Sequence, residues 1–132
     1  DFELKNYKQV SNWLLSLAKK EGFSIKNLHY NYVSPDQIQS LNNEFLKHNY
    51  VTDVLAFDYC EGGELSAEVF ICQTQVEKNA KELSQSVENE TLRVLCHALF
   101  HLCVYNDNTD KELAVIRAKE DGAISSFKTT HK

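Results

Sequence analysis

The spacing of apolar residues changes several times along this chain, and each spacing predicts one kind of element. Near the start, apolar side chains recur every three or four residues, as on one face of a helix, at Val10, Trp13, Leu14 and Leu17. Gly22 follows them and can end that helix. Over residues 28–33, apolar and polar side chains alternate, which predicts a strand.

A second helix is predicted from Ser34-Pro35-Asp36-Gln37. This sequence puts serine at the N-cap, proline at the first helical position and glutamine where it can complete a capping box. An apolar stripe follows at Ile38, Leu41 and Phe45.

Two short apolar runs, residues 54–57 and 69–72, predict strands that are buried on both faces. The Gly62-Gly63 pair lies between them. We therefore expect an antiparallel pair of strands joined by a short loop.

Three more helices are predicted in the second half. Thr74 with Glu77 has the spacing of a capping box, for a helix whose inward residues are Val76, Ala80 and Leu83. A long apolar stretch without proline or glycine predicts the next helix, starting near Ser86. Thr109 with Glu112 is a further capping box, and the last helix that it opens turns Leu113, Ile116 and Ile124 inward.

This order of elements predicts an α+β fold with one small mixed sheet and helices packed on it. We expect one domain over residues 1–132, with residues 1–4 as the stump of a first strand.

Composition and charge narrow the class of protein. No apolar run approaches the roughly 20 residues of a membrane span, and no signal peptide is visible. The four cysteines form no C-x-x-C pair, so we expect free thiols in a reducing cytoplasm. A net charge of −5 argues against a broad basic face, so an RNA groove would have to be built locally.

The candidate chemistry centres on His97 and His101, which share one face of the predicted helix. Two imidazoles at that spacing can bind one divalent ion, and Asp107 beyond the helix can add an oxygen ligand. This set suits Zn²⁺ and leaves one position open for water, as in a catalytic site. Packing histidines and a turn aspartate remain the alternative reading. Ala98 stands where a zinc peptidase needs glutamate, which disfavours a protease.

The sequence H-A-L-F-H-L-C-V-Y-N-D, residues 97–107, resembles the H-G-x-L-H-L-x-G-x-D-H signature of the YbeY family. These are metal-dependent endoribonucleases of bacterial rRNA maturation. Asp107 stands at the third histidine, as in a branch of that family. Further similar segments are L-N-N-E-F-L, T-D-V-L-A-F-D-Y, E-V-F-I and R-A-K-E-D, so the likeness runs from about Leu41 to Asp121.

The resemblance implies cleavage of single-stranded RNA by metal-assisted hydrolysis, with rRNA and components of the small ribosomal subunit as partners in the cytoplasm. Arg93, one turn before His97, can clamp a phosphate or form a surface salt bridge. Glu68 takes the place of a family aspartate, either as an acceptor for a ligand histidine or as a base. Lys47 and His48 are weaker phosphate-binding candidates.

The chain departs from the family pattern at Ala67, Glu68, Ala98 and Val104, and at Leu46, where many members have arginine. Two alternatives therefore stay open. One is a metal-dependent hydrolase of a peptide or ester, and the other is a binding module in which the metal is structural.

Overall fold

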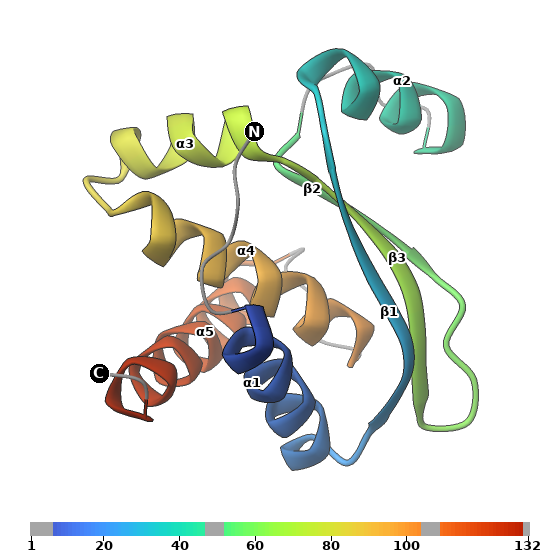
Figure 1. The fold of residues 1–132 in the computed structure, drawn as a ribbon, viewed down its shortest axis with the longest axis vertical. Helices are drawn as coiled ribbons and strands as arrows, with labels where there is room; N and C mark the ends of the chain where they lie inside the picture. Colours follow the sequence, from blue (N-terminus) through green and yellow to red (C-terminus); the bar gives the residue numbers. More distant parts are fainter. Residues whose placement is uncertain (1–6, 47–51, 104–108, 131–132) are drawn as a thin grey trace.

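The computed structural model describes residues 7–46, 52–103 and 109–130. In that part of the chain, five helices and three strands follow one another in the predicted order (Figure 1). They are α1 (Tyr7–Lys20), β1 (Ser24–Val33), α2 (Pro35–Leu46), β2 (Val54–Asp58), β3 (Glu64–Cys72), α3 (Gln73–Glu82), α4 (Val87–Leu102) and α5 (Asp110–Thr130). The predicted strand stump at residues 1–4 lies outside the described residues.

The sheet is mixed, as predicted, with strand order β1-β3-β2. β3 pairs in parallel with β1 and antiparallel with β2. Both β1 and β3 begin earlier than the apolar pattern suggested, because their first residues pair with each other, Ser24 with Glu64. Gly62 and Gly63 adopt positive φ angles in the connection between β2 and β3, a conformation that glycine accepts without strain.

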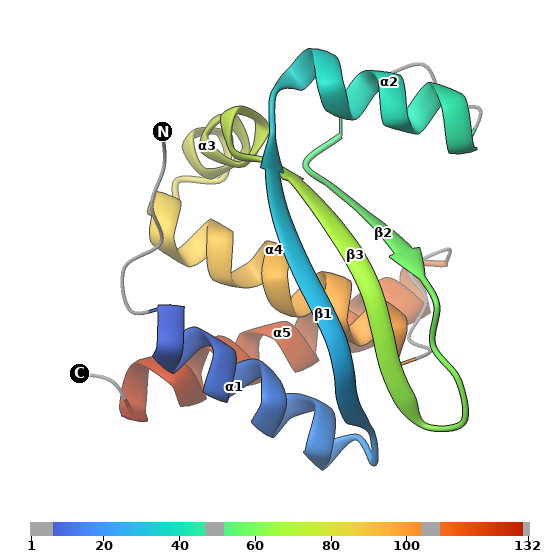
Figure 2. The ribbon, with the colours of Figure 1, turned by 45° about the vertical axis from the view of Figure 1, so that its right-hand side comes forward.

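The main core lies between the inner face of the sheet and helices α1, α4 and α5, which gather on one side of it in Figures 1 and 2. Every second side chain of β3 enters this core, at Leu65, Ala67, Val69 and Ile71. The indole Nε1 of Trp13 donates to the Ala123 carbonyl oxygen at 3.0 Å, which ties α1 to α5. Apolar burial on this face therefore fixes the position of α4 against the sheet.

Helix α2 covers part of the outer face of the sheet. Ile38 is fully buried there with Leu55 and Cys72, and Phe70 packs against this cluster. The predicted burial of the 69–72 run on both faces is confirmed where α2 lies over it.

Side-chain caps begin three of the helices, two of them as predicted, and the third lies at Ser86, where the histidine helix was expected to start. Ser34 and Gln37 exchange the two hydrogen bonds of a capping box, at 2.8 and 3.2 Å. Thr109 and Glu112 do the same, at 3.2 and 3.1 Å, and Ser86 Oγ accepts from the Asn89 amide at 3.0 Å.

The predicted capping box at Thr74 is wrong. β3 runs directly into α3, so Cys72 occupies the N-cap position without a side-chain hydrogen bond. Leu83 also does not face inward: it is the C-cap residue of α3 and is 58% exposed. Thr74 and Glu77 have the spacing of a capping box, but α3 starts at Gln73, directly after the last residue of β3, so Thr74 lies inside the helix and not at its N-cap.

The four cysteines are free, as expected. None of the described helices is both long enough and apolar enough to cross a membrane.

Candidate active-site cleft

A cleft of about 510 Å³ lies between α4, α3 and the segment that enters β2, with Arg117 of α5 at its edge. α4 lines it with residues spaced by helical turns: Glu90, Arg93, Val94, His97, Ala98 and His101. The opposite wall includes Asp53 and Asn79, whose side chains are hydrogen bonded at 3.2 Å. Both predicted metal-binding histidines therefore face the same cleft.

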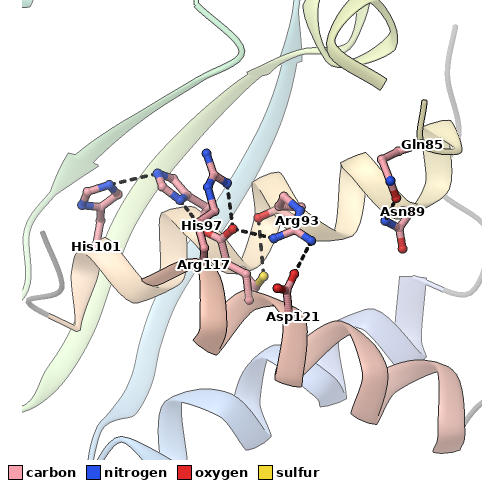
Figure 3. Close-up of polar contacts among 9 residues, drawn as sticks. Gln85, Asn89, Arg93, His97, His101, Arg117 and Asp121 are labelled. Atoms are coloured by element: carbon pink, nitrogen blue, oxygen red, sulfur yellow. Dashed lines mark hydrogen bonds and ion pairs between the residues drawn. The ribbon is translucent and has the colours of Figure 1, made fainter. Parts of the chain in front are cut away.

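The two histidines of α4 direct corresponding ring atoms toward each other (Figure 3). Their Nε2 atoms are 3.0 Å apart, and the ring planes are inclined at 80°. Two nitrogens bound to one tetrahedral ion at about 2.0–2.1 Å each are separated by about 3.3–3.4 Å. The 3.0 Å approach is that of a hydrogen bond between the two rings, and a shift of a few tenths of an ångström would bring both nitrogens to the separation of two ligands.

The other ring nitrogen of His97 contacts a carboxylate from α5. Its Nδ1 is hydrogen bonded to Glu120 Oε2, and Glu120 is fully buried. A histidine that gives its Nδ1–H to a carboxylate presents an unprotonated Nε2, and this arrangement is typical of metal-ligating histidines. Glu120 therefore holds the His97 ring with its Nε2 directed into the cleft.

Two arginines balance the charge of Glu120. Arg93 Nη1 and Arg117 Nη1 lie 2.9 and 2.8 Å from Glu120 Oε1, and Arg93 Nη2 lies 2.6 Å from Asp121 Oδ1 (Figure 3). Burial alone would raise the pKa of Glu120, but the hydrogen bond from His97 and the arginine partners outweigh it and lower that pKa. The carboxylate therefore stays ionised beside His97.

Arg93 lies at the cleft, where a phosphate clamp was predicted, and it also forms the salt bridge that was the alternative. The two descriptions are compatible, because one guanidinium has five donors.

Glu68 does not lie beside the histidines. Its side chain is exposed, and strand alternation puts it on the opposite face of β3 from Ala67 and Val69, which are buried against the helices. The role of carboxylate partner to a ligand histidine, predicted for Glu68, is occupied by Glu120.

Three other predicted site residues, Lys47, His48 and Asp107, lie outside the described residues. Within the residues that the structure does describe, no group of three or more histidine, cysteine, aspartate or glutamate side chains is arranged to hold a metal. The described part of the site therefore fits two ligands and their carboxylate support.

Sequence reasoning missed the role of Glu120, although R-A-K-E-D had been noted as a charged segment. Ile116, Glu120 and Ile124 are spaced four residues apart, so Glu120 interrupts the buried stripe of α5. A glutamate on the apolar stripe of a helix indicates a buried partner, and that signal was available.

The family profile described as Endoribonuclease YbeY matches residues 1–128 of this chain. The chain belongs to the YbeY family. This match covers nearly the whole sequence, including the histidine helix and Glu120.

The sequence of this YbeY chain is similar to those of known relatives over most of its length. It is 38% identical to Endoribonuclease YbeY of Cytophaga hutchinsonii over 125 residues, which is 94% of this chain and 87% of the relative. It is 34% identical to the Flavobacterium johnsoniae protein of the same name over 127 residues, 96% of this chain and 91% of that one.

A solved structure has the same fold. The solution structure of TM1509 from Thermotoga maritima is similar with a TM-score of 0.65 and 29% sequence identity. The match covers 95% of this chain and 85% of TM1509. The predicted α+β class is confirmed by this likeness and by the mixed sheet.

Proposed function

We propose that this YbeY protein is a metal-dependent endoribonuclease that cleaves single-stranded RNA at the His97–His101 pair. The observation that supports this most strongly is the 3.0 Å approach of the two Nε2 atoms, with His97 Nδ1 held by buried Glu120. The 3.0 Å approach is that of a hydrogen bond between the rings, and it directs both Nε2 atoms at one point of the cleft, where an ion would replace the shared proton.

The reaction class comes from the family. The matching profile and the relatives from Cytophaga hutchinsonii and Flavobacterium johnsoniae are named endoribonuclease, and rRNA maturation is part of the YbeY function. The chain is accordingly an RNA-cleaving hydrolase that binds RNA. We extend this to one domain over residues 1–132 that acts in the cytoplasm, on rRNA and with components of the small ribosomal subunit, in ribosome quality control.

The proposed ligands are His97, His101 and Asp107, with Zn²⁺ as the preferred ion because two imidazoles and one carboxylate suit it. When bound, a divalent ion lowers the pKa of water to near 7 and neutralises charge on a phosphoryl oxygen. Asp107 follows the branch of the family with aspartate at the third histidine. The extra negative charge makes the ion a weaker Lewis acid than three histidines would.

The protein's own residues orient the site and balance its charge. Glu120 accepts from His97 Nδ1, which holds the ring with Nε2 toward the cleft. Arg93 and Arg117 keep Glu120 ionised, and the guanidinium N–H groups that these ion pairs leave over line the cleft and can donate to a phosphate. Lys47 and His48 remain candidates for more distant phosphate contacts.

The test is cleavage of a single-stranded RNA by wild type, His97→Ala, His101→Ala and a control, His29→Ala. His29 is an exposed histidine of β1 and does not line the cleft. We expect both cleft variants to lose at least about 100-fold in rate, since a loss of one metal ligand removes the ion's contribution. Equal cleavage by all four proteins would contradict the metal mechanism, and turnover of a peptide without cleavage of RNA would favour another hydrolase.

A further inference from the structure

Glu90 lines the cleft but has no role in the proposed metal mechanism. No hydrogen bond from the protein compensates for the burial of its carboxylate. It is only 5% exposed, and its Oε1 atom is buried without a hydrogen-bond partner. It lies in the first turn of α4, where the helix dipole favours a negative charge but supplies no hydrogen bond to that oxygen. A buried carboxylate oxygen without a donor is costly, so its retention at the wall of a cleft points to a ligand.

The distance from Glu90 to the histidines indicates which part of an RNA substrate would lie beside it. Glu90 and His97 are seven residues apart on α4 and both line the cleft. Two helical turns correspond to about 10 Å along the axis. With the scissile phosphate at the two histidines, the adjacent nucleotide would lie beside Glu90.

Charges of both signs surround Glu90. Arg93 and Asp53 exert the largest charge effects on it, in opposite senses, and Arg117 and Glu120 add smaller effects of each sign. Both arginines are themselves paired with Glu120, and Arg93 also with Asp121. The surroundings of Glu90 therefore carry no excess of positive charge that would favour a second phosphate, and the group that fits its unpartnered oxygen is one with an N–H or O–H donor.

We propose that Glu90 is a substrate-recognition residue that accepts a hydrogen bond from a ribose 2′-hydroxyl or a base N–H of the nucleotide next to the scissile phosphate. The inference depends on the proposed placement of that phosphate at His97 and His101. A 2′-hydroxyl and a base amine both donate to a carboxylate, and both are exposed in single-stranded RNA. The apolar side chains of Val94 and Leu83, which also line the cleft, suit the flat faces of a base.

The charges around Glu90 agree with this assignment. Burial raises the pKa of Glu90, Arg93 and Arg117 lower it, Asp53 and Glu120 raise it, and the net direction is upward. A donor from the substrate would favour the ionised carboxylate and offset the cost of its burial.

The test compares RNA binding and cleavage by wild type, Glu90→Met and Glu90→Gln, with Glu88→Gln as the matched control. Glu88 is an exposed glutamate of the same helical turn and does not line the cleft. Methionine keeps the length of the side chain and is apolar, so this variant is expected to fold with a raised melting temperature. We expect Glu90→Met to weaken RNA binding about 10- to 100-fold, the loss of one hydrogen bond to a charged group. Glu90→Gln, which keeps one acceptor, should lose less, and Glu88→Gln should match wild type.

Modified oligonucleotides then separate the two donors. A single 2′-deoxy substitution that weakens wild type but adds nothing to the loss in Glu90→Met identifies the ribose, whereas the same pattern with a base analogue that lacks the N–H identifies the base. If Glu90→Met binds and cleaves RNA with wild-type constants, the inference is overturned. A second bound equivalent of Mg²⁺ that is lost in Glu90→Met would also overturn it, in favour of a cation.

The same variants distinguish a failure of the proposed metal mechanism from a failure of the Glu90 inference. If His97→Ala and His101→Ala retain full cleavage while Glu90→Met loses RNA binding, the proposed ion site falls and the contact of Glu90 with substrate stands.

Discussion

The buried glutamates Glu120 and Glu90 differ in whether protein partners offset the cost of removing their charge from water. The oxygens of Glu120 contact His97, Arg93 and Arg117, so its charge is paired on several sides. Glu90 has a buried oxygen without a partner. At the scale of the residue, the first carboxylate is part of the framework and the second is available to a ligand.

Replacement of Glu120 by alanine is expected to damage both stability and metal affinity. The change leaves His97 Nδ1 and two guanidinium groups without their shared acceptor, and loss of one member of a buried ionic group costs about 3 kcal/mol. Loss of a carboxylate behind a metal-ligating histidine weakens metal binding about 10- to 100-fold. Urea unfolding and zinc titration measure the two effects. Asp121→Asn, at an exposed carboxylate of the same network, should cost less than about 1 kcal/mol, and equal losses in both variants would contradict the special role of Glu120.

Glu90 should make stability depend on pH in the sense opposite to that of an ordinary paired carboxylate. Because its pKa is raised in the folded protein, the unfolded chain ionises first, and ionisation of Glu90 disfavours folding at neutral pH. The penalty is present above the raised folded pKa and disappears as pH falls below the ordinary glutamate value of about 4.3. Glu90→Gln should therefore be more stable than wild type at pH 7, with the difference vanishing near pH 4. Thermal unfolding across that range measures it, and a variant that is less stable at pH 7 would refute this account.

At the scale of the element, α4 serves the core and the cleft with different faces. Leu92, Leu95, Leu99 and Leu102 are buried on it, while His97 and His101 line the cleft. The same helix thus fixes the imidazoles on a rigid support, since its apolar face is locked between the sheet and two other helices.

The helix caps supply a matched pair of substitutions. Thr109→Ala should destabilise the protein by about 1 kcal/mol, because Thr109 Oγ1 accepts from the Glu112 amide at the start of α5. Thr74→Ala changes a threonine with the same spacing to a glutamate but removes no cap, since α3 begins without a side-chain hydrogen bond. Its cost should stay within about 0.5 kcal/mol, as at an ordinary surface position. Chemical denaturation resolves the two values, and equal costs would show that the Thr74 box forms after all.

At the scale of the whole molecule, the cleft exists only because separate segments meet. α4 supplies one wall, and the segment entering β2, held by the Cys72 amide and by Asn79, supplies the other. Arg117 and Glu120 come from α5. Folding therefore assembles the cleft, and the proposed ion, if bound there, would stabilise the folded state by mass action.

Zinc should raise the stability of wild type in proportion to its occupancy. At a free concentration 100 times the dissociation constant, the expected gain is about 2.7 kcal/mol. Calorimetry with and without a chelator measures it. His29→Ala should respond as wild type does, whereas His97→Ala should respond much less, and an equal shift in His97→Ala would place the ion elsewhere.

Local order along this chain was predictable because it depends on residues three or four positions apart. The element order, the capping boxes at Ser34 and Thr109 and the shared face of His97 and His101 all follow from such spacings. The prediction of a capping box at Thr74 was wrong because it used only this local spacing, which does not show that a strand runs directly into the helix.

The sequence by itself therefore determined the elements, their order and the histidine pair, because those depend on neighbours along the chain. Only the tertiary structure decided which carboxylate serves His97. Glu120 is 23 residues away and reaches it because α5 packs on α4, while Glu68 is turned to the far face of β3 by strand alternation. The site's charge balance depends on how distant segments pack, and helical spacing does not contain that information.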